Sequence, residues 1–208
     1  MTKARNSRAG SGLELLLVAA VAIGLALLIQ AFLVKPYRIP SGSMLPTLRV
    51  GQRILVDRIG SNFSSPRIGD IVVFHPPKYY SRGCANPSEG VNRDGQYATR
   101  GCAVRQALPS SLTFVKRVVG LPGDRLRIVG GHVYRDGVRE RDAYIDPCHG
   151  IGSCDFPGTI AVPRGDYYMM GDNRGESDDS RFWGPVPKAW IIGEAFLTYW
   201  PLDRIGFL

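Results

Sequence analysis

Residues 113–119 read Thr-Phe-Val-Lys-Arg-Val-Val, a run in which β-branched and aromatic residues flank one lysine and one arginine. Such residues favour an extended backbone, so the run predicts a β-strand. Side chains alternate between the two faces of a strand, which places Lys116 on the same face as Phe114 and Val118. The run therefore predicts a β-fold that holds a lysine among apolar neighbours.

Runs of the same kind lie on both sides of this stretch. On the C-terminal side, the pairs Gly130-Gly131 and Asp136-Gly137 are typical of two-residue hairpin turns. Beyond residue 48 no stretch keeps the sustained helical apolar period of about 3.6 residues. The sequence therefore predicts a mainly β domain of antiparallel strands. The other expected strands are 53–59 (RILVDRI), 71–75 (IVVFH), 125–129 (RLRIV), 166–170 (DYYMM) and 190–200 (WIIGEAFLTYW).

An almost wholly apolar run occupies residues 13–34. As a helix rising about 1.5 Å per residue it spans about 33 Å, enough to cross a bilayer core of about 30 Å. The alternative is a cleavable signal peptide, whose apolar region is about 7–15 residues and ends at a small-residue site. Here the run is longer and leads into Lys-Pro-Tyr-Arg at 35–38. We therefore expect a cytosolic tail at 1–11, a single transmembrane helix at 12–34 and an exported β-domain at 35–208.

The net charge of +8 comes from 26 basic and 18 acidic residues that are interleaved along the chain. No block of five or more like charges occurs, so we expect no partner of the nucleic-acid class. A basic exterior suits an anionic bilayer surface, so membrane lipid is an expected partner. Lys3, Arg5 and Arg8 favour a cytosolic N-terminus, but Lys35 and Arg38 follow the apolar run closely and weaken this inference.

The segment at 76–111 is polar and rich in glycine, asparagine and arginine, and we interpret it as a surface insertion. An even number of cysteines suits disulfides in an oxidising compartment, although the sequence leaves their pairing open. His149 lies between two of them, but structural zinc usually needs four ligands at tighter paired spacings, so we expect no metal. The four cysteines are Cys84, Cys102, Cys148 and Cys154.

Two serines lie in an apolar, proline-bracketed stretch at 39–48, Ile-Pro-Ser-Gly-Ser-Met-Leu-Pro-Thr-Leu. Pro40 and Pro46 exclude a helix interior and Gly42 permits a tight backbone, so the stretch displays a hydroxyl at a bend. A serine-rich turn that leaves a membrane segment is the plainer interpretation.

Lys116 provides a chemical partner for such a hydroxyl. A lysine among apolar neighbours loses hydration of its charged form, so its pKa falls and the neutral amine can accept a serine proton. A lysine that reaches solvent from a strand edge is the alternative. A Ser-His mechanism would draw on His75, His132 or His149, none of which lies in a motif typical of a catalytic base.

A polar loop at 171–184, GDNRGESDDSRFWG, brings acids, arginines and hydroxyls together, as in a cross-braced loop that supports a site. With PSGSMLPTL at 40–48, RIGDIVVF at 67–74 and FVKRVVGLPGD at 114–124, it resembles the bacterial type I signal peptidase family. The four motifs occur in the family's order after an apolar N-terminal run. The resemblance implies the antiparallel β-fold of signal peptidases and covers essentially the whole expected exported part.

The resemblance also implies a catalytic apparatus without a cofactor. Ser43 matches the family's nucleophile and Lys116 its general base. The hydroxyl of Ser41 and the backbone N–H of Ser43 match the oxyanion hole, and Ser177 matches the serine that orients the lysine by a hydrogen bond.

Further residues match supporting roles in the family. Two ion pairs that brace the site correspond to Asp172 with Arg117 and to Asp179 with Arg181. Shallow apolar pockets for the small side chains at −1 and −3 of the cleavage site correspond to Ile39, Pro40, Met44, Leu48, Phe114 and Val115. The spacing of Cys148 and Cys154 resembles a disulfide of some members.

By this resemblance the chain is expected to be a membrane-bound serine endopeptidase that cleaves signal peptides from preproteins after Ala-X-Ala sites. The expected location is the bacterial inner membrane, with the catalytic domain on the periplasmic side and the translocation machinery as a further partner. Many members have Asp-Asn where this chain has Gly175-Glu176, some have two membrane segments, and the 76–111 insertion has no assigned counterpart. The alternatives are a specialised maturation peptidase for pilus or conjugation proteins and a non-catalytic anchored β-domain.

Overall fold

The computed structural model describes residues 8–60, 64–79, 84, 101–148 and 154–208. Eight strands form a large sheet in which the pairings of the described strands are all antiparallel. Its order is β1 (Val34–Arg38), β2 (Arg53–Asp57), β11 (Ile191–Trp200), β3 (Ile71–Phe74), β4 (Phe114–Gly120), β9 (Asp166–Met170) and β10 (Val186–Pro187), with β12 (Gly206–Phe207) paired to β11. The predicted antiparallel β class is therefore confirmed.

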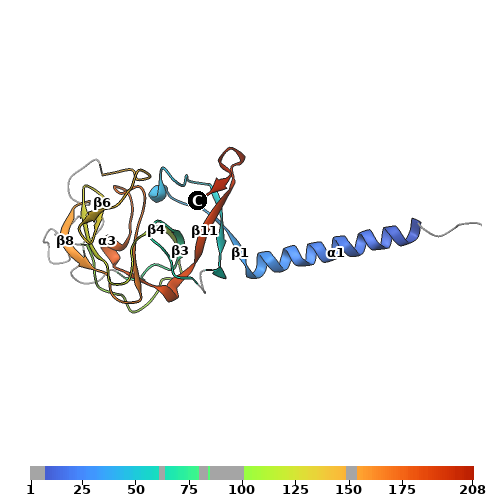
Figure 1. Cartoon of the computed structure of the whole chain (residues 1–208), viewed down its shortest axis with the longest axis horizontal. Helices are drawn as coiled ribbons and strands as arrows, with labels where there is room; N and C mark the ends of the chain where they lie inside the picture. The colour runs from blue at the N-terminus through green and yellow to red at the C-terminus, as the bar shows by residue number, and fades with distance from the viewer. Residues whose placement is uncertain (1–7, 61–63, 80–83, 85–100, 149–153) are drawn as a thin grey trace, which may run out of the picture.

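A smaller sheet lies at the far end of the domain from the N-terminal helix (Figure 1). Its strands are β7 (Val138–Arg139), β6 (His132–Arg135), β5 (Arg125–Val129) and β8 (Phe156–Ala161), in that order. Gly130-Gly131 turns β5 into β6 and Asp136-Gly137 turns β6 into β7, and all four residues have positive φ angles of 51–86°. Both predicted hairpins are therefore confirmed.

All four side chains of strand β3 are buried, so this strand packs against the core on both faces of the large sheet. Ile71 and Val73 join a cluster that includes Met44, and Val72 and Phe74 join a cluster on the other face that includes Trp183. A third buried cluster joins the smaller sheet to β4 and β9. Core packing on both faces of β3 and β4 thus fixes the strand that carries Lys116.

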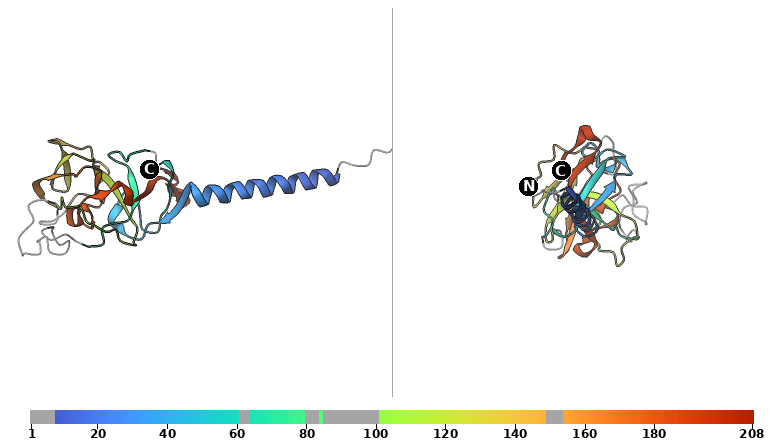
Figure 2. Two further views of the ribbon diagram at one scale, coloured as in Figure 1. Left: turned by 90° about the horizontal axis from the view of Figure 1, so that it is seen from below. Right: turned by 90° about the vertical axis from the view of Figure 1, so that its right-hand side faces the viewer.

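The N-terminal helix α1 (Arg8–Phe32) projects away from the β-domain in both views (Figures 1 and 2). In the part of the chain that the structure describes, no helix meets the length and apolar character needed to span a membrane. The expected transmembrane helix at 12–34 is therefore not shown and stays a proposal, as do the expected domain boundaries.

Most expected strands are present, and β5 and β9 have the predicted bounds. Trp190 belongs instead to a short 3-10 turn, η2 (Lys188–Trp190), that precedes β11. The sequence analysis missed β1, β8, β10 and β12, because the first three contain proline and the last has only two residues. It also missed the one-turn helix α3 (Ser180–Trp183) and the 3-10 turn η3 (Leu202–Arg204).

The predicted insertion at 76–111 lies partly outside the described residues. An isolated antiparallel β-bridge between Pro77 and Pro109 joins the two ends of the insertion. The cysteine pairing, which the sequence left open, is Cys84 with Cys102 and Cys148 with Cys154. Among the described residues no group of side chains is suited to hold a metal ion, and His149 lies outside them.

Candidate active site

Ser43 lies in a one-turn 3-10 helix, η1 (Gly42–Met44), which begins four residues after the last residue of β1. Ser41 precedes the turn in extended conformation, and the Leu45 N–H closes it on the Gly42 carbonyl at 3.0 Å. The Met44 side chain is buried in the core, whereas Ser43 is only half-buried. The apolar residue thus anchors the turn and presents the neighbouring hydroxyl.

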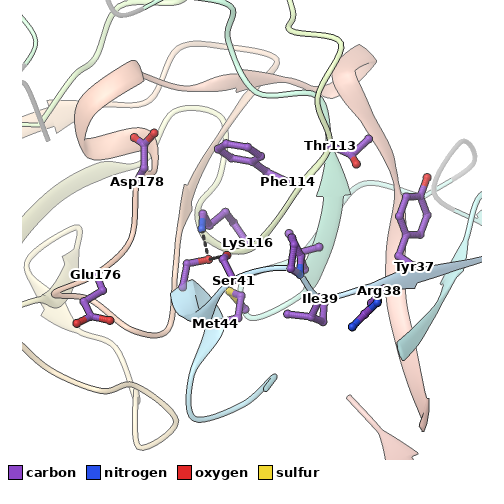
Figure 3. A pocket seen from close by; sticks show the side chains of 13 residues that line it. Tyr37, Arg38, Ile39, Ser41, Met44, Thr113, Phe114, Lys116, Glu176 and Asp178 are labelled. Atoms are coloured by element: carbon purple, nitrogen blue, oxygen red, sulfur yellow. Dashed lines mark hydrogen bonds between the residues drawn. The ribbon is translucent and has the colours of Figure 1, made fainter. Parts of the chain in front are cut away.

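The Lys116 side chain reaches Ser43 from strand β4. Its Nζ lies 2.5 Å from Ser43 Oγ, within hydrogen-bonding distance. Lys116 is 3% exposed, and its Nζ lies 5.8 Å from the centroid of the Phe114 ring, on the face that the sequence predicted. Figure 3 shows the lysine directed at the serine turn. The structure therefore brings together the two residues predicted as nucleophile and base.

Burial lowers the pKa of Lys116 from 10.5 to about 8, because the charged ammonium loses its hydration. The carboxylates of Asp179, Asp178 and Asp172 act against this shift, and Arg181 adds to it. An amine with this pKa is neutral in a large fraction of molecules near pH 8, so it can accept the hydroxyl proton of Ser43.

A second hydroxyl lies beside the pair. Ser41 Oγ is 3.4 Å from Ser43 Oγ, and Ser41 is exposed at the edge of the site. This placement suits the Ser41 hydroxyl as a hydrogen-bond donor to negative charge that develops beside Ser43 Oγ. Its oxyanion role stays a prediction.

Asp172, which is fully buried, forms an ion pair with the partly buried Arg117. Arg117 Nε and Nη2 donate to the two Asp172 carboxylate oxygens at 2.8 and 2.6 Å, and Arg117 Nη1 donates to the Gly69 carbonyl at 2.6 Å. Thr47 Oγ1 donates to Asp172 at 2.5 Å. Because Thr47 follows the serine turn by four residues, this network ties the turn to the loop that begins at Gly171.

A second ion pair orders the same loop further on. Asp179 caps helix α3 and receives two hydrogen bonds from the Arg181 guanidinium, at 2.8 and 2.9 Å. The Gly171 N–H also donates to Asp179, at 3.0 Å. Burial by itself would raise the pKa of Asp179, but Arg181 and Lys116 lower it below its ordinary value. The predicted pair is therefore present, with an ionised carboxylate near Lys116.

The loop contacts the backbone of Ser43 directly. The Asn173 N–H donates to the Ser43 carbonyl at 3.1 Å, and Asn173 Nδ2 donates to the Gly42 carbonyl at 3.3 Å. A side chain at Gly171 would overlap the Ser43 carbonyl oxygen and the Ser177 hydroxyl. The sequence analysis quoted both residues in its motif but gave neither a role, because these contacts join segments about 130 residues apart.

Ser177 differs from its predicted role in one respect. Its hydroxyl is buried and has no hydrogen-bond partner among the described residues, so the expected bond to Lys116 is not seen. The Lys116 amine is directed instead at Ser43. The orienting role of Ser177 stays a prediction.

An open cavity of ≈ 420 Å³ lies over the two serines and Lys116 (Figure 3). Of the six expected pocket residues, Ile39, Pro40, Met44, Phe114 and Val115 line it. Leu48 is not among the lining residues and is fully buried in the core cluster with Ile54 and Val56, so its expected place in the pocket stays a prediction. Additional lining residues that the sequence analysis did not assign are Tyr37, Arg38, Thr113, Glu176 and Asp178.

With this geometry established, comparison with known proteins identifies the family. The family described as "Signal peptidase, peptidase S26" matches residues 12–200. The chain belongs to the signal peptidase family.

Individual relatives agree with this assignment. The probable signal peptidase I-1 of Synechocystis sp. is 37% identical over 190 residues, which cover 90% of this chain and 82% of the relative. Signal peptidase I of Leptolyngbya laminosa is also 37% identical over 190 residues, which are 90% of this chain and 79% of the relative. A solved signal peptidase I from Enterococcus faecalis is 24% identical and covers 63% of this chain and 97% of its own, with a TM-score of 0.37, too low for a structural comparison.

The histidines lie apart from the signal peptidase site in the described part of the chain. His75 Nδ1 is 2.8 Å from the Leu112 carbonyl, and His75 lines a different cavity. His132 Nδ1 pairs with Asp142 at 2.6 Å on strand β6 of the smaller sheet. Neither lines the cavity over Ser43, so the Ser-His alternative gains no support from the described geometry.

Proposed function

We propose that this member of the signal peptidase family is a membrane-anchored serine endopeptidase that removes signal peptides from exported preproteins. The observation that carries the proposal is the buried Lys116 amine, with a pKa of about 8, at 2.5 Å from Ser43 Oγ in an open cavity. For a lysine with only a structural role, a single hydrogen bond to a serine hydroxyl would not repay the cost of burying its charge.

The proposed reaction is acyl transfer. Neutral Lys116 removes the proton from Ser43 Oγ, which attacks the substrate carbonyl and forms a tetrahedral oxyanion. Lys116 then protonates the leaving amine as the acyl-enzyme forms. A water molecule gives a proton to Lys116 and attacks the acyl carbonyl, and Lys116 returns this proton to Ser43 Oγ as the ester bond breaks, which releases the signal peptide and regenerates the free serine.

Ser41 is proposed to stabilise the oxyanion together with the Ser43 backbone N–H. Its hydroxyl lies 3.4 Å from the attacking oxygen, so it is close to the position that the substrate carbonyl oxygen would occupy. Removal of one such donor typically lowers kcat by about 100- to 1,000-fold. We therefore expect that loss for Ser41→Ala, with little change in KM.

The cavity favours an extended peptide with small side chains. Its walls come from the end of β1 and the segment that follows it, from the first residues of β4 and from the loop after β9. The pairing of β4 with β9 begins at Arg117, which leaves the edge of Phe114–Lys116 open to a main chain that binds as an added strand. Apolar walls at Ile39, Met44 and Val115 then suit small residues at −1 and −3, as in an Ala-X-Ala site.

Helix α1 is proposed as the membrane anchor. Consecutive large apolar side chains, Leu15, Leu16, Leu17 and Val18, are 64–71% exposed, so their apolar surface faces outward all round the helix. Lipid would cover this surface and keep the active site close to membrane-bound preproteins and to the translocation machinery. The proposed location is the bacterial inner membrane, with the β-domain on the periplasmic side.

Cleavage of a preprotein with an Ala-X-Ala site by the full chain in detergent tests the proposal. Wild type is expected to cleave after the final alanine, and Ser43→Ala and Lys116→Ala are expected to be inactive with unchanged circular dichroism. Near-normal cleavage by either folded variant would contradict the Ser-Lys mechanism. A folded wild type that cleaves no preprotein would favour the non-catalytic alternative, and one that cleaves only pilin-type precursors would favour a specialised peptidase.

A further inference from the structure

Charged side chains of opposite sign lie at the two ends of the candidate active-site cavity. Glu176 and Asp178 line one end, which we call the acidic end. Arg38 lines the other, and Figure 3 shows the Lys116 amine between them. A substrate that crosses the cavity therefore meets negative charge on one side of the serine only.

The acidic end is fixed to the segment that carries the nucleophile. Asn173 Nδ2 donates to Glu176 Oε2 at 3.3 Å and to the Gly42 carbonyl at 3.3 Å. The Glu176 N–H in turn donates to the Asn173 carbonyl at 3.2 Å. Glu176 is exposed, Asp178 is half-buried, and both residues line the cavity.

The direction of the substrate follows from the proposed function, on which this inference rests. Ile39 lies on the same side of Lys116 as Arg38 and Tyr37, where the residues before the cleavage site are proposed to bind (Figure 3). The scissile carbonyl must lie at Ser43. The peptide that follows it therefore leaves the cavity on the opposite side, past the acidic end.

We propose that Glu176 and Asp178 select the first residues after the cleavage site by charge, favouring basic residues and disfavouring acidic ones. The attraction is between side-chain charges at a partly hydrated surface, so its size is modest and depends on salt. Replacement of lysine by glutamate reverses the sign of the interaction, and we expect it to change kcat/KM by about tenfold at low salt.

Three peptides with one Ala-X-Ala sequence test the proposal. They carry lysine, glutamine or glutamate at both of the first two positions after the site. The full chain in detergent at pH 9 is expected to cleave them in the order lysine, glutamine, glutamate. The ratio of kcat/KM for the lysine and glutamate peptides should fall to within about twofold in the double variant Glu176→Gln, Asp178→Asn, and should decrease in high salt.

Arg38→Gln is the matched control, because it also removes one charge from the cavity wall but at the other end. It should leave the lysine-to-glutamate ratio unchanged. Each ratio compares two peptides on one protein, so a change in overall activity of a variant cancels. A ratio near one in active wild type, or a ratio that survives in the double variant, would overturn the charge selection and leave the proposed function intact. Failure to cleave any of the three peptides would overturn both.

Discussion

Replacement of Lys116 by methionine should stabilise the protein while it abolishes activity. The folded state lowers the pKa of Lys116 from 10.5 to about 8, so the charged form is disfavoured by folding. The pKa difference of about 2.5 between the two states corresponds to a free-energy cost of folding of about 3 kcal/mol. Loss of the hydrogen bond to Ser43 offsets about 1 kcal/mol of this. We therefore expect Lys116→Met to raise the free energy of unfolding at pH 7 by about 2 kcal/mol.

The sign of this effect depends on pH. Between about pH 8 and 10.5 the unfolded chain binds a proton at this lysine that the folded chain does not, so wild-type stability rises with pH across this window. Below about pH 8 Lys116 is protonated in both the folded and the unfolded state, so the full free-energy cost of burying its charge remains. The advantage of the methionine variant should therefore be largest at pH 7 and disappear near pH 10.5.

Urea unfolding of the full chain in detergent, followed by tryptophan fluorescence at pH 7 and pH 10, measures this difference. Lys35→Met is the control, because Lys35 is exposed on the edge strand β1 and should give a small difference at both pH values. A methionine variant that is no more stable than wild type at pH 7, or a difference that does not change with pH, would refute the reasoning.

Three further predictions concern the loop that follows β9. Gly171→Ala should lower kcat/KM at least about tenfold and lower the free energy of unfolding by about 2 kcal/mol, because the added methyl group would overlap the Ser43 carbonyl oxygen. Gly175 has open space around it, so Gly175→Ala should change the free energy of unfolding by less than about 0.5 kcal/mol in the same urea assay. Asp172→Asn should lower the free energy of unfolding by about 3 kcal/mol, because it leaves the charged Arg117, which is 11% exposed, without its ion-pair partner. An unchanged midpoint of urea unfolding would contradict this prediction. Asp178→Asn should move the inflection of the pH–rate profile to lower pH, because the Asp178 carboxylate raises the pKa of Lys116, the proposed base. A shift of the inflection to higher pH would contradict this prediction.

The features that the sequence predicted well are local ones. Strand β5 and its glycine hairpin follow from residues 125–131 alone, because β-propensity and the positive φ angles of Gly130 and Gly131 are set within a few residues. The strand that carries Lys116 likewise indicated its face, shared with Phe114 and Val118, but not whether its amine is buried or reaches solvent. The sequence could not show strand β1, because Pro36 argues against a strand and pairing with β2 compensates for it only in the folded sheet.

Features of the candidate site that the sequence could not show depend on contacts between distant residues. Thr47 supports Asp172 across 125 positions, and no local pattern distinguishes it from any threonine near a turn. Leu48 was assigned to the pocket by family resemblance, but its N–H bonds the Met44 carbonyl and its side chain packs into the core. Glu176 and its neighbours in the loop were quoted as a motif, but only the fold shows which of them border the cavity.

The Ser-Lys dyad is the central claim, and the fraction of protein acylated at Ser43 tests it most directly. Full-length enzyme in detergent is mixed with a peptide ester that ends in Ala-X-Ala, quenched in acid within milliseconds and digested for mass spectrometry. We predict an acyl group on the Ser43 peptide in wild type, at a rate that increases through about pH 8, and none in Lys116→Met at any pH in this range. Acylation of another residue, or equal acylation of Ser43 in the methionine variant, would contradict the account.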